Sequence, residues 1–197
     1  MIPGYRVQNT TINITVPTFP LQSVLSVNNW IVMQQIVDAP QGFNRPWADF
    51  KAGFGTYDGN FWFGLEKVYQ MTNSGNYRFR IEVMTTTWKW FSAEYDSFSI
   101  SPEGSQYTLS ISGYSGDTGD VMLDRRNNGV GYLLSMPFST YDRNNRNNCA
   151  VAQGCGWWHN QCSWINPGGP FYFHYLPDQI SNPKTYLITC RMMMKHL

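Results

Sequence analysis

The amino-acid sequence predicts a single α+β domain. Helix signals lie early in the 197-residue chain, period-two alternation dominates the middle, and most Gly, Asn and Pro residues fall within residues 113–183, where long functional loops are expected. Helices and strands that are segregated along a chain are typical of the α+β class. This length supports one substantial hydrophobic core, and no low-complexity linker divides the chain.

The first part of the chain is expected to combine a strand with two short helices. Residues 29–37 form an apolar run bounded by turn residues, which predicts a buried strand. The first helix is expected to begin at residues 44–46, with its proline at an early helical position, and to end at Gly53. The second is expected over residues 64–70, before a stop signal at residues 73–76.

The middle and the end of the chain are expected to form strands. Residues 77–83 alternate between apolar and charged side chains, which predicts an antiparallel strand with one buried face. Further strands are expected over residues 88–91, 93–100 and 107–112, and residues 184–194 are an apolar closing strand.

Composition and charge exclude several classes of function. The net charge is +1 and only 14% of residues are charged, so the chain has no electrostatic footprint for nucleic acid. The sequence contains no run of about 20 apolar residues, so no membrane-spanning helix is predicted. The start of the chain lacks the features of a signal peptide, so a secreted form would be a mature fragment or an isolated domain.

Enzyme and metal templates do not match. Residues 113–116 begin like a nucleophile elbow, but Asp117 stands where that motif needs glycine. Cys149, Cys155 and Cys162 could in principle bind zinc together with a nearby histidine, yet their spacing fits no ligand knuckle. A non-catalytic recognition domain is therefore expected.

Two features favour an extracellular protein. Asn9 and Asn13 each begin an Asn-x-Thr tripeptide and are candidate glycosylation sites. All four cysteines fall in the last quarter of the sequence, which favours a local disulfide framework over a cytosolic redox site.

Several short motifs rich in aromatic residues and glycine follow one another between Trp30 and Cys162. They are FNRPW at 43–47, KAGFG at 51–55, FWFGLEK at 61–67, YRFRIE at 77–82, AEY at 93–95, YSGDTGD at 114–120, FSTYDRNNRNNCA at 138–150 and GWWHNQC at 156–162. In this order they resemble the fibrinogen C-terminal domain family.

The resemblance implies a secreted, non-enzymatic fold with a central twisted antiparallel sheet and short helices. Residues 1–27 match the family's N-terminal part only loosely, and residues 28–135 would hold the helices and the sheet. Residues 136–183 would form the loop-rich ligand-binding subdomain, and residues 184–197 would close the sheet.

The resemblance also implies one disulfide. Cys149 and Cys162 match the family's late disulfide, which would stabilise the fold by about 3 kcal/mol in the chain-entropy model. The family's earlier disulfide has no counterpart, since no cysteine precedes Cys149. Cys155 and Cys190 could form a second bridge or remain buried thiols.

The family's calcium loop is altered in this sequence. Asp142 occupies the first position of the loop, but Asn144 and Arg146 stand where the family has ligand carboxylates. Calcium needs six to eight oxygen ligands, and an arginine brings positive charge to the site. We therefore expect no metal and no other cofactor.

The candidate ligand-binding residues come from the C-terminal loops. A serine, Ser163, stands where acetyl-binding relatives have histidine, and the aromatic residues near the end of the loops could either stack on a ligand or pack beneath the shortened loops. The first tryptophan of the pair is as easily a core residue. The candidates are Trp157, Trp158, His159, Asn160, Gln161, Ser163, Tyr172, Phe173 and Tyr175.

Three functions fit this family. The favoured hypothesis is a lectin-like protein of innate defence that binds glycans or acetylated groups. The alternatives are a protein ligand for a cell-surface receptor and a structural domain of matrix or clotting type. Relatives are commonly multimerised through a stalk. No heptad repeat is visible in this sequence, so such a part is either absent or outside it.

Overall fold

A computed structural model gives the fold of the protein. It describes residues 9–16, 18–20, 22–37, 42–125, 129–143, 147–162, 165, 167–168, 172–173 and 185–197. Among these residues, no helix is long and apolar enough to cross a membrane.

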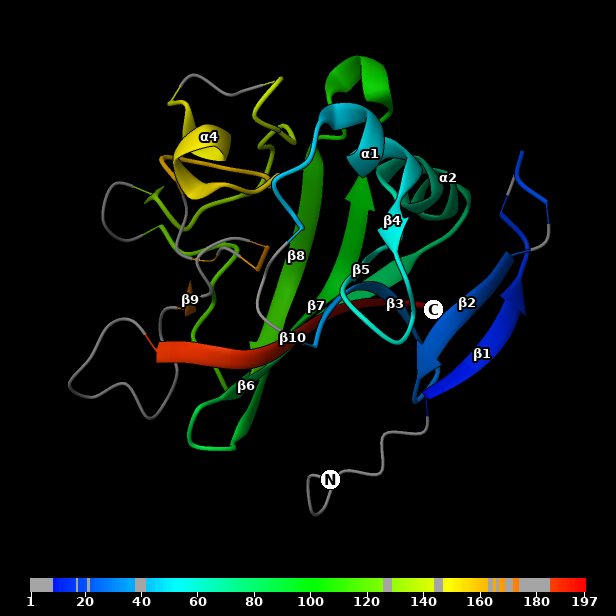
Figure 1. Ribbon diagram of the computed structural model, residues 1–197, viewed down its shortest axis with the longest axis horizontal. Helices are drawn as coiled ribbons and strands as arrows, with labels where there is room; N and C mark the ends of the chain where they lie inside the picture. Colours follow the sequence, from blue (N-terminus) through cyan, green and yellow to red (C-terminus); the bar gives the residue numbers. More distant parts are fainter. Residues whose placement is uncertain are drawn as a thin grey trace.

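One antiparallel sheet organises the molecule (Figure 1), and its main strands follow the order β1-β2-β3-β10-β6-β7-β8. The last strand, β10, lies between β3 and β6 and pairs with both. The end of the sequence therefore joins the two halves of the sheet. The strands are β1 (Asn9–Ile14), β2 (Gln22–Val27), β3 (Trp30–Ile36), β6 (Tyr77–Thr85), β7 (Trp90–Ile100), β8 (Leu109–Gly116) and β10 (Thr185–His196).

Three two-residue strands extend this sheet. β4 (Phe54–Gly55) pairs with β5 (Phe61–Trp62), and β5 also pairs with β3. β9 (Tyr172–Phe173) pairs with the beginning of β10. These short strands connect the segments that follow β3 and the loops near the C-terminus to the main sheet.

The two predicted helices are present with different bounds. α1 (Trp47–Ala52) begins after Pro46, which is the N-cap in an extended conformation rather than a helical residue. α2 (Leu65–Ser74) continues one turn beyond the expected end at residue 70. The extra turn is stabilised by tertiary packing, because Met71 and Thr72 are buried, and it ends before Gly75.

Gly53 ends α1 at a φ of 97°, which a residue with a side chain rarely adopts. A Cβ atom at this position would lie 2.5 Å from the carbonyl oxygen of Phe63. The close approach of the two backbones explains why glycine is needed where the helix turns into β4.

The strands β6 and β7 give the sheet two different faces. In β6 the side chains of Tyr77, Phe79, Ile81 and Val83 are buried in the core, whereas Arg78 and Arg80 lie on the opposite face and remain partly exposed. α2 packs against β7, and α1 packs against α2. The alternation therefore separates an apolar face, covered by helices, from a charged face.

The predicted strands in this region differ from the observed ones. Residues 88–91 and 93–100 were expected to form separate strands, but β7 is continuous from Trp90, and Trp88 lies in the turn before it with a φ of 62°. β8 begins two residues later than expected and extends to Gly116, so residues 113–116 are part of a strand and not a nucleophile elbow.

Residues 129–143 and 147–162, here called the loop region, lie together on one side of the sheet, opposite the β1–β2 hairpin (Figure 1). Their core is continuous with that of the sheet. It includes Leu133, Phe138, Cys155, Trp157 and Trp158.

Candidate functional site

A disulfide and a short helix hold the loop region together. Cys149 and Cys162 are bonded, with their Cα atoms 4.9 Å apart, which confirms the implied pairing. α4 (Cys149–Gln153), a helix that the sequence did not predict, begins at the first of these cysteines. An isolated bridge between Ser139 and Trp157 joins the two segments of the region. The disulfide therefore fixes the segment that carries most of the expected ligand-binding residues.

The two tryptophans of this segment are core residues. Trp157 and Trp158 expose 1% and 0% of their surface, and their ring centroids lie 5.1 Å apart in an edge-to-face arrangement. Trp158 also packs edge-on against Phe138, and its indole N–H donates to the carbonyl oxygen of Tyr107 at 2.7 Å. With so little of either side chain reaching solvent, the expectation that both tryptophans contact a ligand needs correction. They fill the interior of a region with little regular structure.

His159 is buried as well. Only 2% of its surface is exposed, and its Nε2 lies 3.1 Å from the carbonyl oxygen of Cys155. Burial disfavours the imidazolium and lowers the pKa of His159 to about 4. This histidine is therefore neutral at physiological pH and supports the loop from inside.

The next two residues lie closer to the surface. Asn160 is partly buried, and its amide group donates at 2.9 Å to the carbonyl oxygens of both Gly129 and Tyr132. It therefore binds the two segments of the loop region to each other. Gln161 is exposed.

The remaining candidates are placed only in part. Tyr172 and Phe173 form β9 and pair with Tyr186 and Thr185 of β10. Ser163 and Tyr175 lie outside the described residues. Their contribution to a binding surface stays a prediction.

The altered calcium loop uses its remaining aspartate as a structural group. The carboxylate of Asp142 accepts the backbone N–H of Trp47 at 2.9 Å and the hydroxyl of Thr140 at 2.7 Å. Asn144 and Arg146 lie outside the described residues. Asp142 thus holds the beginning of α1 against the loop region, and loss of calcium binding stays a prediction.

A small charged cluster covers the same junction between α1 and the loop region. Glu103 accepts the indole N–H of Trp47 at 2.8 Å and pairs with Lys51 at 2.6 Å. The hydrogen bond from Lys51, reinforced by that from Trp47, lowers the pKa of Glu103. Arg143 lies 4.0 Å above the Trp47 ring in a cation–π contact. Together these contacts hold α1 against the end of the first segment of the loop region, at Arg143.

The two other cysteines are buried thiols. Cys155 and Cys190 are not bonded to each other or to the disulfide. Cys190 lies in the middle of β10, paired with Ile36 and Val83 on either side. Cys155 lies in the loop region, where its thiol contacts the carbonyl oxygen of Gly156 at 3.1 Å. The second of the two alternatives left open by the sequence is the one observed.

The candidate glycosylation sites lie on β1, where Asn13 pairs with Ser23 and is exposed to solvent. Glycosylation of Asn9 and Asn13 stays a prediction. Sequence reasoning missed one surface feature, a charged cleft on β6 and β7, although the alternation of Arg78, Arg80 and Glu82 was a signal for it.

Comparison with known proteins agrees with this geometry. The family model that describes the C-terminal globular domain of the fibrinogen beta and gamma chains matches residues 23–181. The protein belongs to this family. Its members are not enzymes, in agreement with the expectation from the sequence.

Angiopoietin-related proteins are among its relatives. Human angiopoietin-related protein 6 is 35% identical over 156 residues, which cover 77% of this chain and 32% of the relative. The sequence thus spans about a third of the length of the curated relative that it matches.

Two solved structures show the same fold. The fibrinogen-like globe domain of human ANGPTL6 superposes with a TM-score of 0.80 at 29% identity, covering 98% of this chain and 90% of that one. Lamprey fibrin D-dimer, complexed with the peptide Gly-His-Arg-Pro-amide, gives a TM-score of 0.73 at 27% identity, covering 89% and 65%.

Proposed function

We propose that this domain is the extracellular recognition part of a protein ligand that binds a cell-surface receptor. The observation that carries the proposal is which side chains of the loop region are buried and which are exposed. The tryptophans expected to line a sugar pocket are buried, whereas Tyr141 and Val151 expose 45% and 52% of their surface. Exposed aromatic and aliphatic side chains on a rigid base are well suited to a protein interface.

The relatives support this proposal over the lectin-like one. Angiopoietin-related proteins match at 35–37% identity over 68–77% of this chain. The lamprey relative was solved with a bound peptide, so a domain of this fold can hold a protein segment. The disulfide favours an oxidising, extracellular compartment. Regions outside this sequence would supply the multivalency that strengthens weak single contacts.

The proposal is tested by binding a fluorescent, artificially multimerised domain to cells of the source organism. If a receptor protein is the partner, mild trypsin treatment of the cells removes the binding. Enzymatic removal of cell-surface glycans leaves most of it intact. Binding that resists trypsin but disappears after deglycosylation would contradict a protein receptor and restore the lectin-like hypothesis.

A further inference from the structure

A cleft of about 260 Å³ opens on the charged face of the sheet, on strands β6 and β7. None of its lining residues belongs to the loop region, so it is a separate site from the one considered above. It is lined by Arg80, Glu82, Trp90, Phe91, Ser92 and Asp117.

A buried ion pair forms the base of this cleft. Glu82, which is 8% exposed, accepts the Nε–H of Arg80 at 2.7 Å and a hydrogen bond from Arg191 at 3.0 Å. Arg191 is 5% exposed, and its guanidinium carbon lies 5.2 Å from the centroid of the Trp90 ring. The pair therefore fixes both the acidic floor and the aromatic wall.

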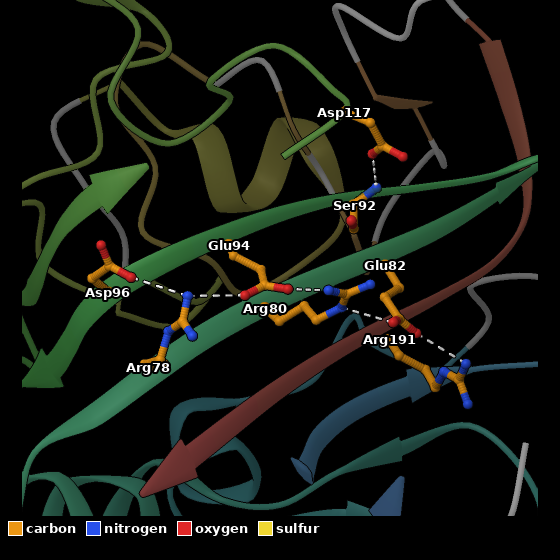
Figure 2. Close-up of polar contacts among 8 residues, drawn as sticks. All are labelled: Arg78, Arg80, Glu82, Ser92, Glu94, Asp96, Asp117 and Arg191. Carbon is orange, nitrogen blue, oxygen red and sulfur yellow. Dashed lines mark hydrogen bonds and ion pairs between the residues drawn. The ribbon is translucent and has the colours of Figure 1, made fainter. Parts of the chain in front are cut away.

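Arg80 is held at two of its three guanidinium nitrogens. Its Nε pairs with Glu82 and its Nη1 with Glu94 (Figure 2). The third nitrogen, Nη2, makes no hydrogen bond to the other residues drawn in Figure 2, and Arg80 is one of the residues that line the cleft. A donor whose direction is already fixed loses little conformational entropy when it binds a ligand.

The opposite rim supplies an acceptor and a hydroxyl. One carboxylate oxygen of Asp117 accepts the backbone N–H of Ser92 at 2.5 Å, and the other points away from that bond (Figure 2). Within the described part of the protein, neither this second oxygen nor the Ser92 hydroxyl has a partner. The cleft thus offers a fixed donor, a fixed acceptor and a hydroxyl beside an aromatic wall.

This set of groups selects the charge of the ligand. An anion would face the carboxylate of Asp117, and a cation would face the guanidinium of Arg80 and leave its free N–H unpaired. A neutral ring with several hydroxyls satisfies both groups, because each hydroxyl donates and accepts, and its C–H face can lie on Trp90. The volume is below the range of about 300–1,000 Å³ that is usual for drug-sized ligands, so it suits one ring unit.

We propose that the cleft formed by Arg80, Trp90, Ser92 and Asp117 binds a single neutral sugar residue of a glycan. The proposal does not depend on the receptor-binding function proposed for the loop region. The two sites would act on one partner if the receptor is a glycoprotein.

The test is a titration of the folded domain with the methyl glycosides of N-acetylglucosamine, galactose and mannose. Binding is measured by calorimetry and by ligand-observed NMR. At least one of them should bind saturably, with a Kd of about 1 mM, as expected for one small ring. Trp90→Ala and Asp117→Asn should each weaken this binding at least about tenfold. Trp88→Ala is the matched control, because Trp88 is 63% exposed on the adjacent turn and does not line the cleft.

The outcomes separate the alternatives. If binding does not saturate at a sugar concentration of about ten times the expected Kd, the proposal is overturned. So does sugar binding that survives both Trp90→Ala and Asp117→Asn, or preferential binding of methylguanidinium or sulfate at the cleft. If Trp90→Ala does not fold, Ser92→Ala with Asp117→Asn decides the question. Cell binding that persists in a Trp90→Ala domain with no sugar binding would show that the receptor site is distinct.

Discussion

The central sheet and the loop region are stabilised in different ways. In the sheet, alternation along β6 buries one row of side chains, and hydrogen bonds to β7 and β10 satisfy the backbone. The loop region has one five-residue helix and isolated bridges among its described residues. Its interior therefore depends on large aromatic side chains and a disulfide. A buried aromatic residue of the loop region is therefore expected to stabilise the fold rather than to contact a ligand.

The largest expected effect comes from removing a ring from the loop interior. Trp158→Ala should lower the free energy of unfolding by about 3–5 kcal/mol, because it opens a cavity and leaves the carbonyl of Tyr107 without its donor. Urea denaturation, monitored by circular dichroism, measures the change in the free energy of unfolding. Trp88→Ala, which removes an exposed ring beside the sheet, should change stability by less than about 0.5 kcal/mol. Equal effects of both substitutions would refute the comparison.

Loss of the disulfide should affect the loop region next most strongly. The double variant Cys149→Ser with Cys162→Ser should lose about 3 kcal/mol of stability, given the sequence separation of 13 residues. Its denaturation midpoint should no longer respond to dithiothreitol, whereas that of the unmodified protein should fall. Hydrogen exchange should quicken in the loop region and stay slow in β6 and β10. Uniform acceleration would mean that the two regions unfold as one unit.

His159 should make the loop region sensitive to acid. Its pKa is about 4 in the folded protein and near 6.5 when it is exposed. Between these values the unfolded protein binds a proton that the folded protein does not, so stability falls as the pH is lowered. The loss should be about 2 kcal/mol between pH 7 and pH 5. His159→Gln should flatten this part of the stability profile, and an unchanged profile would contradict the burial of the neutral imidazole.

A smaller effect is expected where the loop region meets α1. Asp142→Ala should lower stability by about 1 kcal/mol, because the backbone N–H of Trp47 loses its acceptor. Asp142→Asn keeps an acceptor and should have a smaller effect in the same thermal-melting experiment. An equal loss of stability in the two variants would show that the charge of Asp142, and not the hydrogen bond that it accepts, is what stabilises this junction.

Calcium should have no effect. Addition of about 5 mM calcium, above the range in which extracellular modules bind it, should leave the melting temperature unchanged. A rise in melting temperature, or saturable heat in a calorimetric titration, would show that the altered loop at Asp142 still binds the ion.

The sequence predicted the elements that depend on local patterns. The alternation of residues 77–83 and the apolar closing segment predicted β6 and most of β10. Neither pattern could predict the last turn of α2, which depends on burial of Met71, or the depth of Trp157 and Trp158 beneath the loops.

The alternation along β6 was a signal for a charged face, but it could not show that a cleft forms there. Its lining residues come from β6, from β7 and from the residue after β8. Only the register of the strands, which places Glu82 opposite Ser92, brings them together. The Cys149–Cys162 pairing followed from the family resemblance and not from spacing.

The central claim is that the outer surface of the loop region, and not its buried aromatic floor, recognises a protein partner. The most direct measurement compares cell binding by the multimerised domain with that of Tyr141→Asp and Val151→Asp variants whose melting temperatures are unchanged. At least one variant should bind at least about tenfold more weakly, while Trp88→Ala binds normally. Full binding by both loop variants would contradict the claim and place the receptor contact elsewhere on the domain.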